Sequence, residues 1–243
     1  MYGWRARIGL IIPMDNAVIE PELYSLRELE GITFHTARLT THNFPKMPDN
    51  GIELSETFNY LGTDVNVYAC AETSFLKGVD GNKYITEQMQ KITGKPALTA
   101  LSSMIDAIKS LELKKVNLVT PYTDQRNKVL SEFFERMDID VVNSISQTSP
   151  LYLGEEREPY KCNVEPPYTP YRMAKEIDQP DAEAVIISAT NIRTFEIINI
   201  LERDLQKPVI TSNQAIVWSI LRTLNIKQPV PSLGTLLNST PYY

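Results

Sequence analysis

Gly94–Lys109 reads GKPALTALSSMIDAIK, and Gln206–Leu221 reads QKPVITSNQAIVWSIL. Both stretches begin with a Lys-Pro pair, continue with two apolar residues and a threonine, and then become polar and small before an apolar-periodic run. A short buried strand that leads into an amphipathic helix is the building unit of α/β folds. Its recurrence predicts two homologous halves, with chance similarity between two such units as the alternative.

Two further pairs of segments repeat in the same order. Ile8–Pro13 (IGLIIP) matches Val116–Pro121 (VNLVTP), and Val65–Cys70 (VNVYAC) matches Val185–Thr190 (VIISAT) more loosely. Three matched pairs in one order favour an internal duplication over coincidence. We therefore expect two similar lobes related by a pseudo-twofold axis.

Short β-branched runs alternate with helical patterns along the whole chain. Apolar runs without alternation are typical of parallel strands that are covered on both faces. The strand candidates are Arg7–Pro13, Ile32–Arg38, Val65–Cys70, Ala97–Ala100, Val116–Pro121, Val141–Ile145, Ala184–Ser188 and Val209–Ser212. The helix candidates include Leu101–Leu111, Thr123–Met137, Thr194–Leu205 and Asn213–Leu224.

This alternation predicts an α/β protein of two Rossmann-like lobes. Each lobe would hold a four-stranded parallel sheet flanked by helices, with an active site in the cleft between the lobes. We expect residues 1–112 and 213–243 to form an N-terminal lobe that includes a returning C-terminal helix. Residues 113–212 would form the second lobe.

Composition excludes several classes of function. The net charge is −6 and no cluster of lysine and arginine stands out, so we expect no nucleic-acid partner. No apolar run approaches the roughly 18 residues of a membrane span. The chain lacks glycine-rich nucleotide motifs, and His35 and His42 lack metal-ligand spacing. We therefore expect chemistry without a metal, a cofactor or a histidine base.

The two cysteines, Cys70 and Cys162, are too few for a disulfide framework. Because no export signal is evident, the sequence predicts a cytoplasmic protein with free thiols. Cys70 ends an apolar strand, and parallel α/β sheets bind ligands beyond the carboxyl ends of their strands. The functional interpretation is a reactive thiol, and the alternative is a small buried hydrophobe.

Other strand ends contribute polar groups to the same expected cleft. They supply hydroxyls, amides and backbone N–H groups, which suit a small carboxylate. Free N–H groups near Cys70 would lower the pKa of its thiol, whereas the carboxylate of Glu72 would raise it. We expect the amide donors to prevail, because Glu72 can rotate into solvent.

The segment from Gln147 to Tyr171 breaks the alternation. It contains five prolines and four tyrosines, and it is long for a connection between a strand and a helix. A surface excursion is the simpler interpretation. A lid over the cleft is the functional one.

In several motifs the chain resembles the maleate cis–trans isomerases and arylmalonate decarboxylases of the aspartate/glutamate racemase superfamily. The resemblance begins with Gly3–Pro13 (GWRARIGLIIP), followed by Asn16 and Glu20-Pro21-Glu22. Tyr68-Ala69-Cys70 with Ser74-Phe75 is similar to the first cysteine motif of the family, and Thr120-Pro121-Tyr122-Thr123 to its tyrosine motif. Ser188–Thr194 (SATNIRT) resembles the second cysteine motif, and Lys207–Trp218 resembles the closing segment.

The resemblance implies a pseudo-twofold fold and chemistry by thiols without a cofactor. In the isomerases the first cysteine adds to maleate and the second exchanges a proton, whereas the decarboxylases keep only the second. It implies Cys70 as the catalytic thiol and Ala189 at the position of the second. The implied substrate-binding residues are Pro13, Asn16, Ala71, Glu72, Thr73, Ser74, Tyr122, Thr123, Thr190, Asn191 and Arg193.

The sequence departs from the family pattern in three places. Ala189 replaces the second cysteine, by nature or by engineering. Ala71-Glu72-Thr73 replaces the usual Thr-Ser-Gly, so a carboxylate is introduced. Residues 154–157 have no obvious Asp-Asn pair where the isomerases carry a substrate-binding asparagine.

Three functions remain open from the sequence. The first is an isomerase-like enzyme that acts on a small dicarboxylate. The second is a single-cysteine decarboxylase of substituted malonates that protonates from the side of Cys70. The third is a carboxylate-binding protein without catalysis. A homo-oligomer is compatible with each.

Overall fold

The computed structural model describes residues 2–75, 78–146 and 161–238. Two four-stranded parallel sheets have the orders β2-β1-β3-β4 and β6-β5-β7-β8. The strands are β1 (Ala6–Ile12), β2 (Ile32–Arg38), β3 (Val65–Tyr68), β4 (Ala97–Thr99), β5 (Lys115–Thr120), β6 (Asp140–Ser146), β7 (Ala184–Ile187) and β8 (Val209–Thr211). The predicted fold class and all eight predicted strands are confirmed.

Helices flank both sheets. Before β5 the chain forms α1 (Ile19–Tyr24), α2 (Met47–Leu54), α3 (Thr57–Leu61), α4 (Ala71–Phe75), α5 (Gly78–Thr93) and α6 (Ala100–Ser110). After β5 it forms α7 (Asp124–Glu135), α8 (Lys161–Val164), α9 (Tyr168–Ile177), α10 (Ile198–Leu205), α11 (Ser212–Thr223) and α12 (Gly234–Asn238). Short 3₁₀ turns lie at Arg27–Leu29, Phe44–Lys46 (η2) and Pro231–Leu233 (η4).

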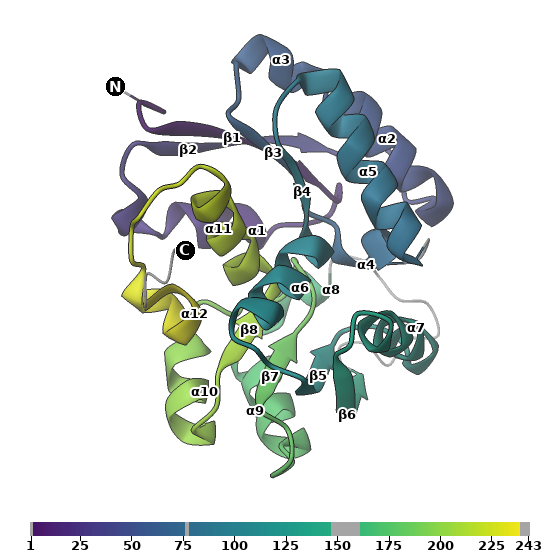
Figure 1. Cartoon of the computed structure of the whole chain (residues 1–243), viewed down its shortest axis with the longest axis vertical. Helices are drawn as coiled ribbons and strands as arrows, with labels where there is room; N and C mark the ends of the chain where they lie inside the picture. The colour runs from purple at the N-terminus through teal and green to yellow at the C-terminus, as the bar shows by residue number, and fades with distance from the viewer. Residues whose placement is uncertain (1, 76–77, 147–160, 239–243) are drawn as a thin grey trace.

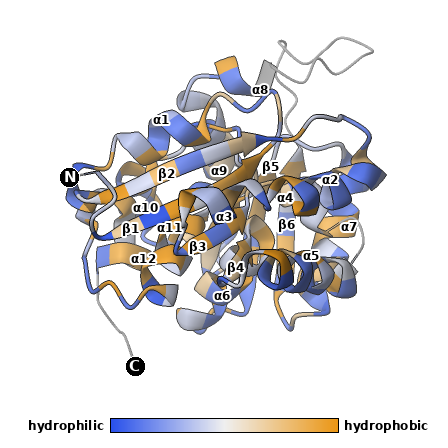
Figure 2. Cartoon of the chain, turned by 90° about the horizontal axis from the view of Figure 1, so that it is seen from above, coloured by the Kyte–Doolittle hydropathy of each residue, from blue (hydrophilic) through white to orange (hydrophobic). Residues whose placement is uncertain are grey.

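The same register repeats in both sheets. In the first, Ile8 of β1 pairs with Val65 of β3, and in the second, Val116 of β5 pairs with Ala184 of β7. All residues of β3 and β7 are buried. Hydrophobic residues run along the central strands, and hydrophilic ones lie mainly on the surrounding helices (Figure 2). Burial on both faces explains why these strands read as unbroken apolar runs.

The repeated sequences form equivalent helices that pack against each other between the sheets. Thr99 caps α6 and Thr211 caps α11, each through a reciprocal capping box. In Figure 1, β1–β4 occupy the upper half and β5–β8 the lower half, with α6 and α11 between them. Because α6 also contacts β8 and α11 contacts β3, each helix packs on the sheet of the other lobe. One hydrophobic core therefore spans both lobes.

The two C-terminal helices contact different sheets. Whereas α11 contacts α1 and β3 of the first lobe, α12 contacts α10 and β8 of the second. The division into residues 1–112 with 213–243 and residues 113–212 stays a prediction.

The ends of β3 and β7 are joined by hydrogen bonds between the lobes. The Thr190 hydroxyl donates to the carbonyl oxygen of Ala69 over 3.0 Å. It accepts from the side-chain amide of Asn16, also over 3.0 Å. Asn16 in turn accepts from the backbone N–H of Val18 and Ile19 at the start of α1. The predicted convergence of the strand ends from both lobes is thereby confirmed.

A buried carboxylate makes a second link between the lobes. Glu22 of α1 accepts from the backbone N–H of Thr194 and Phe195 and from the side-chain amide of Asn213. Because Glu22 holds these N–H groups, α10 begins at Ile198 and not at the predicted Thr194. Burial raises the pKa of Glu22 from 4.5 to about 7, against the opposing effect of the three donors.

This raised pKa predicts a pH-dependent contribution to stability. The folded protein holds the Glu22 proton more tightly than the unfolded chain, so the contribution of Glu22 falls as pH rises from 4.5 through about 7. In Glu22→Gln the side chain does not ionise, so residue 22 no longer lowers the unfolding free energy as pH rises. Relative to wild type, the variant should gain about 3 kcal/mol of unfolding free energy between pH 5 and pH 8. Urea unfolding at both pH values measures it, and a constant difference would contradict the assignment.

Candidate active site

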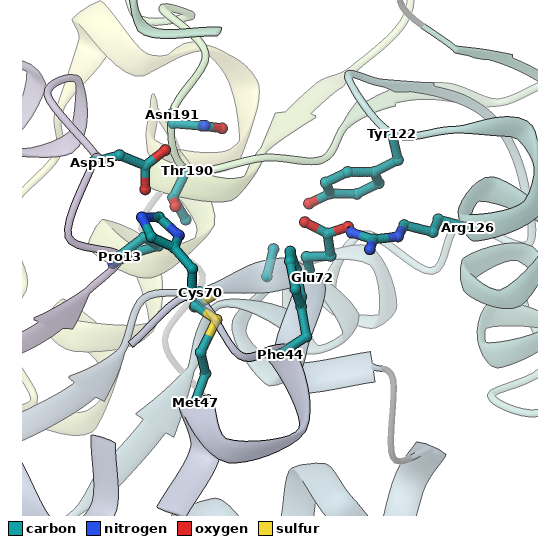
Figure 3. Close-up of a pocket in the computed structure, with 12 residues that line it drawn as sticks. Pro13, Asp15, Phe44, Met47, Cys70, Glu72, Tyr122, Arg126, Thr190 and Asn191 are labelled. Carbon is teal, nitrogen blue, oxygen red and sulfur yellow. The ribbon is translucent and has the colours of Figure 1, made fainter. Parts of the chain in front are cut away.

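A cavity of about 280 Å³ lies between the lobes, where the strand ends meet. Its size is near the lower end of small-molecule sites, which are roughly 300–1,000 Å³. Figure 3 shows Cys70 and Met47 below the centre, with Asp15, Thr190 and Asn191 on one side and Glu72, Tyr122 and Arg126 on the other. The lining residues are Pro13, Asp15, His42, Phe44, Met47, Cys70, Ala71, Glu72, Tyr122, Arg126, Thr190 and Asn191.

Cys70 lies between β3 and α4, and its side chain is held on both sides. The Thr73 hydroxyl donates to the Cys70 sulfur over 3.0 Å, and the Tyr68 hydroxyl lies 2.7 Å from the Thr73 oxygen. The Ser74 hydroxyl donates to the backbone carbonyl of Cys70. Only 4% of Cys70 is exposed, although it lines the cavity. This arrangement fixes the direction of the sulfur toward the cavity.

The expectation that Cys70 has a lowered pKa is wrong. Burial raises the pKa of the thiol, and the negative charge of Asp15 raises it further, whereas the hydrogen bonds from Thr73 lower it. Burial prevails because few polar groups replace the water that a thiolate loses. The thiol is therefore protonated at neutral pH.

Glu72 does not rotate into solvent, contrary to expectation. It forms an ion pair with Arg126 of α7, so the pair joins the two lobes across the cavity. The side chain of Glu72 is 12% exposed and that of Arg126 is 30% exposed. The guanidinium carbon of Arg126 lies 4.3 Å from the centre of the Phe44 ring. This cation–π contact and the ion pair fix the guanidinium in place.

Tyr122 lies on the same side as this ion pair. Its ring contacts Phe75 edge-on, with the ring centres 5.7 Å apart. Its backbone N–H donates to the Thr120 hydroxyl, which fixes the turn after β5. The hydroxyl of Tyr122 points toward the Glu72 carboxylate (Figure 3). A hydroxyl, a carboxylate and a guanidinium thus gather at one end of the cavity.

The opposite wall is built on the loop after β1. Asn163 of α8 donates to the carbonyl oxygen of Asp15 over 2.8 Å and accepts from the backbone N–H of Ala17 over 2.9 Å. This loop places the Asp15 carboxylate on the cavity wall beside Thr190 and Asn191 (Figure 3). An asparagine therefore does support the site, although residues 154–157, where one was sought, lie outside the described residues.

Several predicted site residues do not line the cavity. Asn16, Thr73 and Ser74 are buried directly behind it, and Ala189 is 2% exposed beside Thr190. Thr123 is exposed at the start of α7. Arg193 is exposed and pairs with Glu196, so the structure does not bring it to the other site residues. The residues that it does bring together are Pro13, Cys70, Ala71, Glu72, Tyr122, Thr190 and Asn191.

Five lining residues were missed from the sequence: Asp15, His42, Phe44, Met47 and Arg126. Three of them follow β2, whose carboxyl end was omitted although it lies at the same sheet edge. Arg126 was detectable as the first-turn residue of α7 that faces the strand ends. His42 also lines the cavity, although the expectation of chemistry without a histidine base stays a prediction.

The lid predicted over residues 147–171 falls largely outside the described residues. Its last part forms α8 and the beginning of α9. Among the described residues there is no group of three or more histidine, cysteine, aspartate or glutamate side chains suited to a metal. In the same part of the chain, no helix is long and apolar enough to cross a membrane.

Comparisons with known proteins give one consistent result. The family model of arylmalonate decarboxylase matches residues 8–237. A maleate isomerase of Geobacillus stearothermophilus is 26% identical, with 96% of this chain and 97% of that protein covered. An arylmalonate decarboxylase of Bordetella bronchiseptica is 22% identical, with 87% and 85% covered.

Solved structures show the same fold. The maleate isomerase of Pseudomonas putida S16 superposes with a TM-score of 0.88 at 24% identity, covering 98% of this chain and 99% of that one. A cysteine-to-serine mutant of the Nocardia farcinica maleate cis–trans isomerase, with a covalently bound succinylcysteine intermediate, has a TM-score of 0.86 at 20% identity. The superposition covers 96% of this chain and 98% of the mutant chain.

The surroundings of Cys70 predict opposite shifts for two variants. Because the thiolate is the reactive form, alkylation by iodoacetamide should rise with pH through a midpoint above the roughly 8.5 of a free thiol. Thr73→Val removes a stabilising donor and should move the midpoint to higher pH. Asp15→Asn removes a repelling charge and should move it to lower pH. Mass spectrometry of the Cys70 peptide measures the rates. Shifts in the reverse directions, or a wild-type midpoint below that of a free thiol, would contradict this assignment.

Proposed function

The chain belongs to the arylmalonate decarboxylase family, and we propose that it is a cofactor-independent, thiol-dependent enzyme that isomerises a small cis-unsaturated dicarboxylate, as maleate isomerases do. The observation that carries this proposal is the position of Cys70, whose sulfur is held at the cavity by Thr73. The maleate isomerases that match the chain over nearly its whole length support the substrate class.

The proposed reaction needs one thiolate. The Cys70 sulfur adds to one carbon of the double bond, and the π electron pair moves through the other carbon onto its carbonyl group. The former double bond is now single, so the substrate rotates about it. The electron pair then returns, the carbon–sulfur bond breaks, and the trans isomer leaves with the thiolate restored.

Groups on both walls serve this reaction in the proposal. His42 lines the cavity and supplies a group that can accept the thiol proton. The amide of Asn191 and the backbone N–H groups around Thr190 bind the carboxylate at that end. Tyr122 donates to the carbonyl oxygen that gains charge at the other end. An oxyanion donor of this kind contributes roughly 3–4 kcal/mol to the lowering of a barrier.

Ala189 takes the place of the family's second thiol, and the proposed route does not use a second thiol. A relative supports the addition of a thiol to the double bond: a cysteine-to-serine mutant of the Nocardia farcinica isomerase holds a covalently bound succinylcysteine intermediate. Ala189 is buried directly before Thr190, which lines the cavity. The alanine leaves the strand end intact and removes one proton-transfer group.

Decarboxylation of a substituted malonate is the second candidate. The raised pKa of Cys70 favours it, because a protonated thiol can donate a proton to the enediolate that forms when carbon dioxide leaves. Phe44 and Met47 offer an apolar wall for the substituent. The thiol would protonate from the wall opposite to Ala189, so the product should have the inverse handedness of that from decarboxylases with the second cysteine.

Three properties stay predictions: the homo-oligomeric state, the cytoplasmic location and the extent of the domains. None of them enters the proposed mechanism.

Two substitutions test the proposal. Cys70→Ala should abolish turnover of maleate. Ala189→Cys should leave both the melting temperature and the turnover of maleate nearly unchanged, because the proposed route uses no second thiol. Proton NMR of maleate and of a prochiral malonate with wild type and both variants measures this.

The same data separate the alternatives. Turnover of the malonate alone would establish the decarboxylase. If Cys70→Ala loses no turnover on either substrate, Cys70 is not catalytic, and if the wild type converts neither substrate, the chain is a binding protein.

A further inference from the structure

One ion pair spans the two lobes at the cavity. Glu72 lies in α4, two residues after Cys70, and its partner Arg126 lies in α7 of the other lobe. Both residues line the cavity, and their charged groups point toward each other (Figure 3). Phe44 covers one face of the guanidinium and holds it at the cavity wall. A ligand in the cavity of Cys70 therefore meets this pair as well.

The charges of the lining residues set a condition for binding a dicarboxylate. Arg126 is the one permanent cation among the described residues that line the cavity, whereas Asp15 and Glu72 contribute two carboxylates. A guanidinium binds a carboxylate through two parallel N–H donors, which makes it the natural group for a dianion to seek. This guanidinium is already paired with Glu72. A carboxylate of the ligand and that of Glu72 therefore compete for one cation.

The depth of the pair permits such an exchange of partners. The side chain of Glu72 is 12% exposed and that of Arg126 is 30% exposed, so water reaches the pair. An ion pair that water reaches is held far less firmly than one in a dry interior. Glu72 can leave by rotation about its side-chain bonds, while the contact with Phe44 keeps Arg126 in place.

We propose that Arg126 binds one carboxylate of the substrate and that Glu72 is an internal competitor, which the substrate displaces. This inference rests on the dicarboxylate substrate of the proposed function and adds a binding residue to its site. In the proposed reaction, the carboxylate at this end receives the π electron pair. It becomes more negative as the Cys70 sulfur adds, so the guanidinium lowers the barrier as well as KM.

Calorimetry with succinate, an unreactive dicarboxylate, measures the binding step apart from catalysis. A competitor that occupies Arg126 for about nine-tenths of the time weakens binding about 10-fold. Glu72→Gln removes the competitor and keeps the size of the side chain, so Kd should fall by about that factor. Arg126→Gln should raise Kd by about 10-fold, and Arg126→Lys should restore part of the loss because it keeps the charge. Thermal melting confirms that each variant is folded.

Double variants separate competition from simple repulsion. If Glu72 competes for Arg126, Glu72→Gln should tighten succinate binding only while Arg126 is present. Asp15→Asn is the matched control, because it removes a carboxylate from the opposite wall of the cavity. Its effect on Kd should be the same with Arg126 and with Arg126→Gln. An equal gain from Glu72→Gln in both backgrounds, or an unchanged Kd in Arg126→Gln, would overturn the inference.

Turnover of maleate by the same variants, followed by proton NMR, tests the proposed function separately. KM should follow the Kd values for succinate, and Arg126→Gln should also lower kcat. Turnover of maleate without the expected shifts in Kd would overturn the inference and leave the isomerase function standing. The expected shifts in Kd without turnover by any variant would overturn the isomerase function and leave Arg126 as the carboxylate-binding residue.

Discussion

The hydroxyl of Thr190 joins the two lobes at the one place where their central strands end together. It donates to the carbonyl oxygen of Ala69, directly before Cys70, and accepts from Asn16, whose side-chain oxygen accepts from the backbone N–H of Val18. Each such bond contributes on the order of 1 kcal/mol, so its importance lies in position more than in stability. It sets how far the Cys70 wall stands from the Asn191 wall, and hence the size of the cavity.

Burial then determines what the thiol can do. A cavity closed by both lobes withdraws water from Cys70 and raises its pKa, while Thr73 keeps a hydrogen bond directed at the sulfur. The same withdrawal of water strengthens the Glu72–Arg126 ion pair, which lies across the two lobes. The raised pKa of Cys70 and the strength of the ion pair thus both follow from the closure of the cavity by the two lobes. The pair of charges at one end and the thiol between the walls form a single site.

The fold was predictable because the two halves repeat the same apolar runs, and apolar runs of this kind indicate buried strands. The strand ends around Pro13, Cys70 and Tyr122 were predictable for the same reason, since parallel strands end at one edge. The loop after β2 was missed, because the side chains of His42, Phe44 and Met47 reach the cavity through a turn whose path no periodicity reveals. The partner of Glu72 and the pKa of Cys70 depend on distances between lobes, which local sequence does not contain.

The central claim is that the Cys70 thiolate alone opens the double bond, without a proton exchanged with solvent at carbon. Isomerisation in deuterium oxide tests it most directly, with the trans product of maleate followed by proton NMR at low conversion. The account predicts a product that keeps both vinyl protons and carries no deuterium. One deuterium per turnover would contradict it and would require an acid–base group on the Ala189 wall.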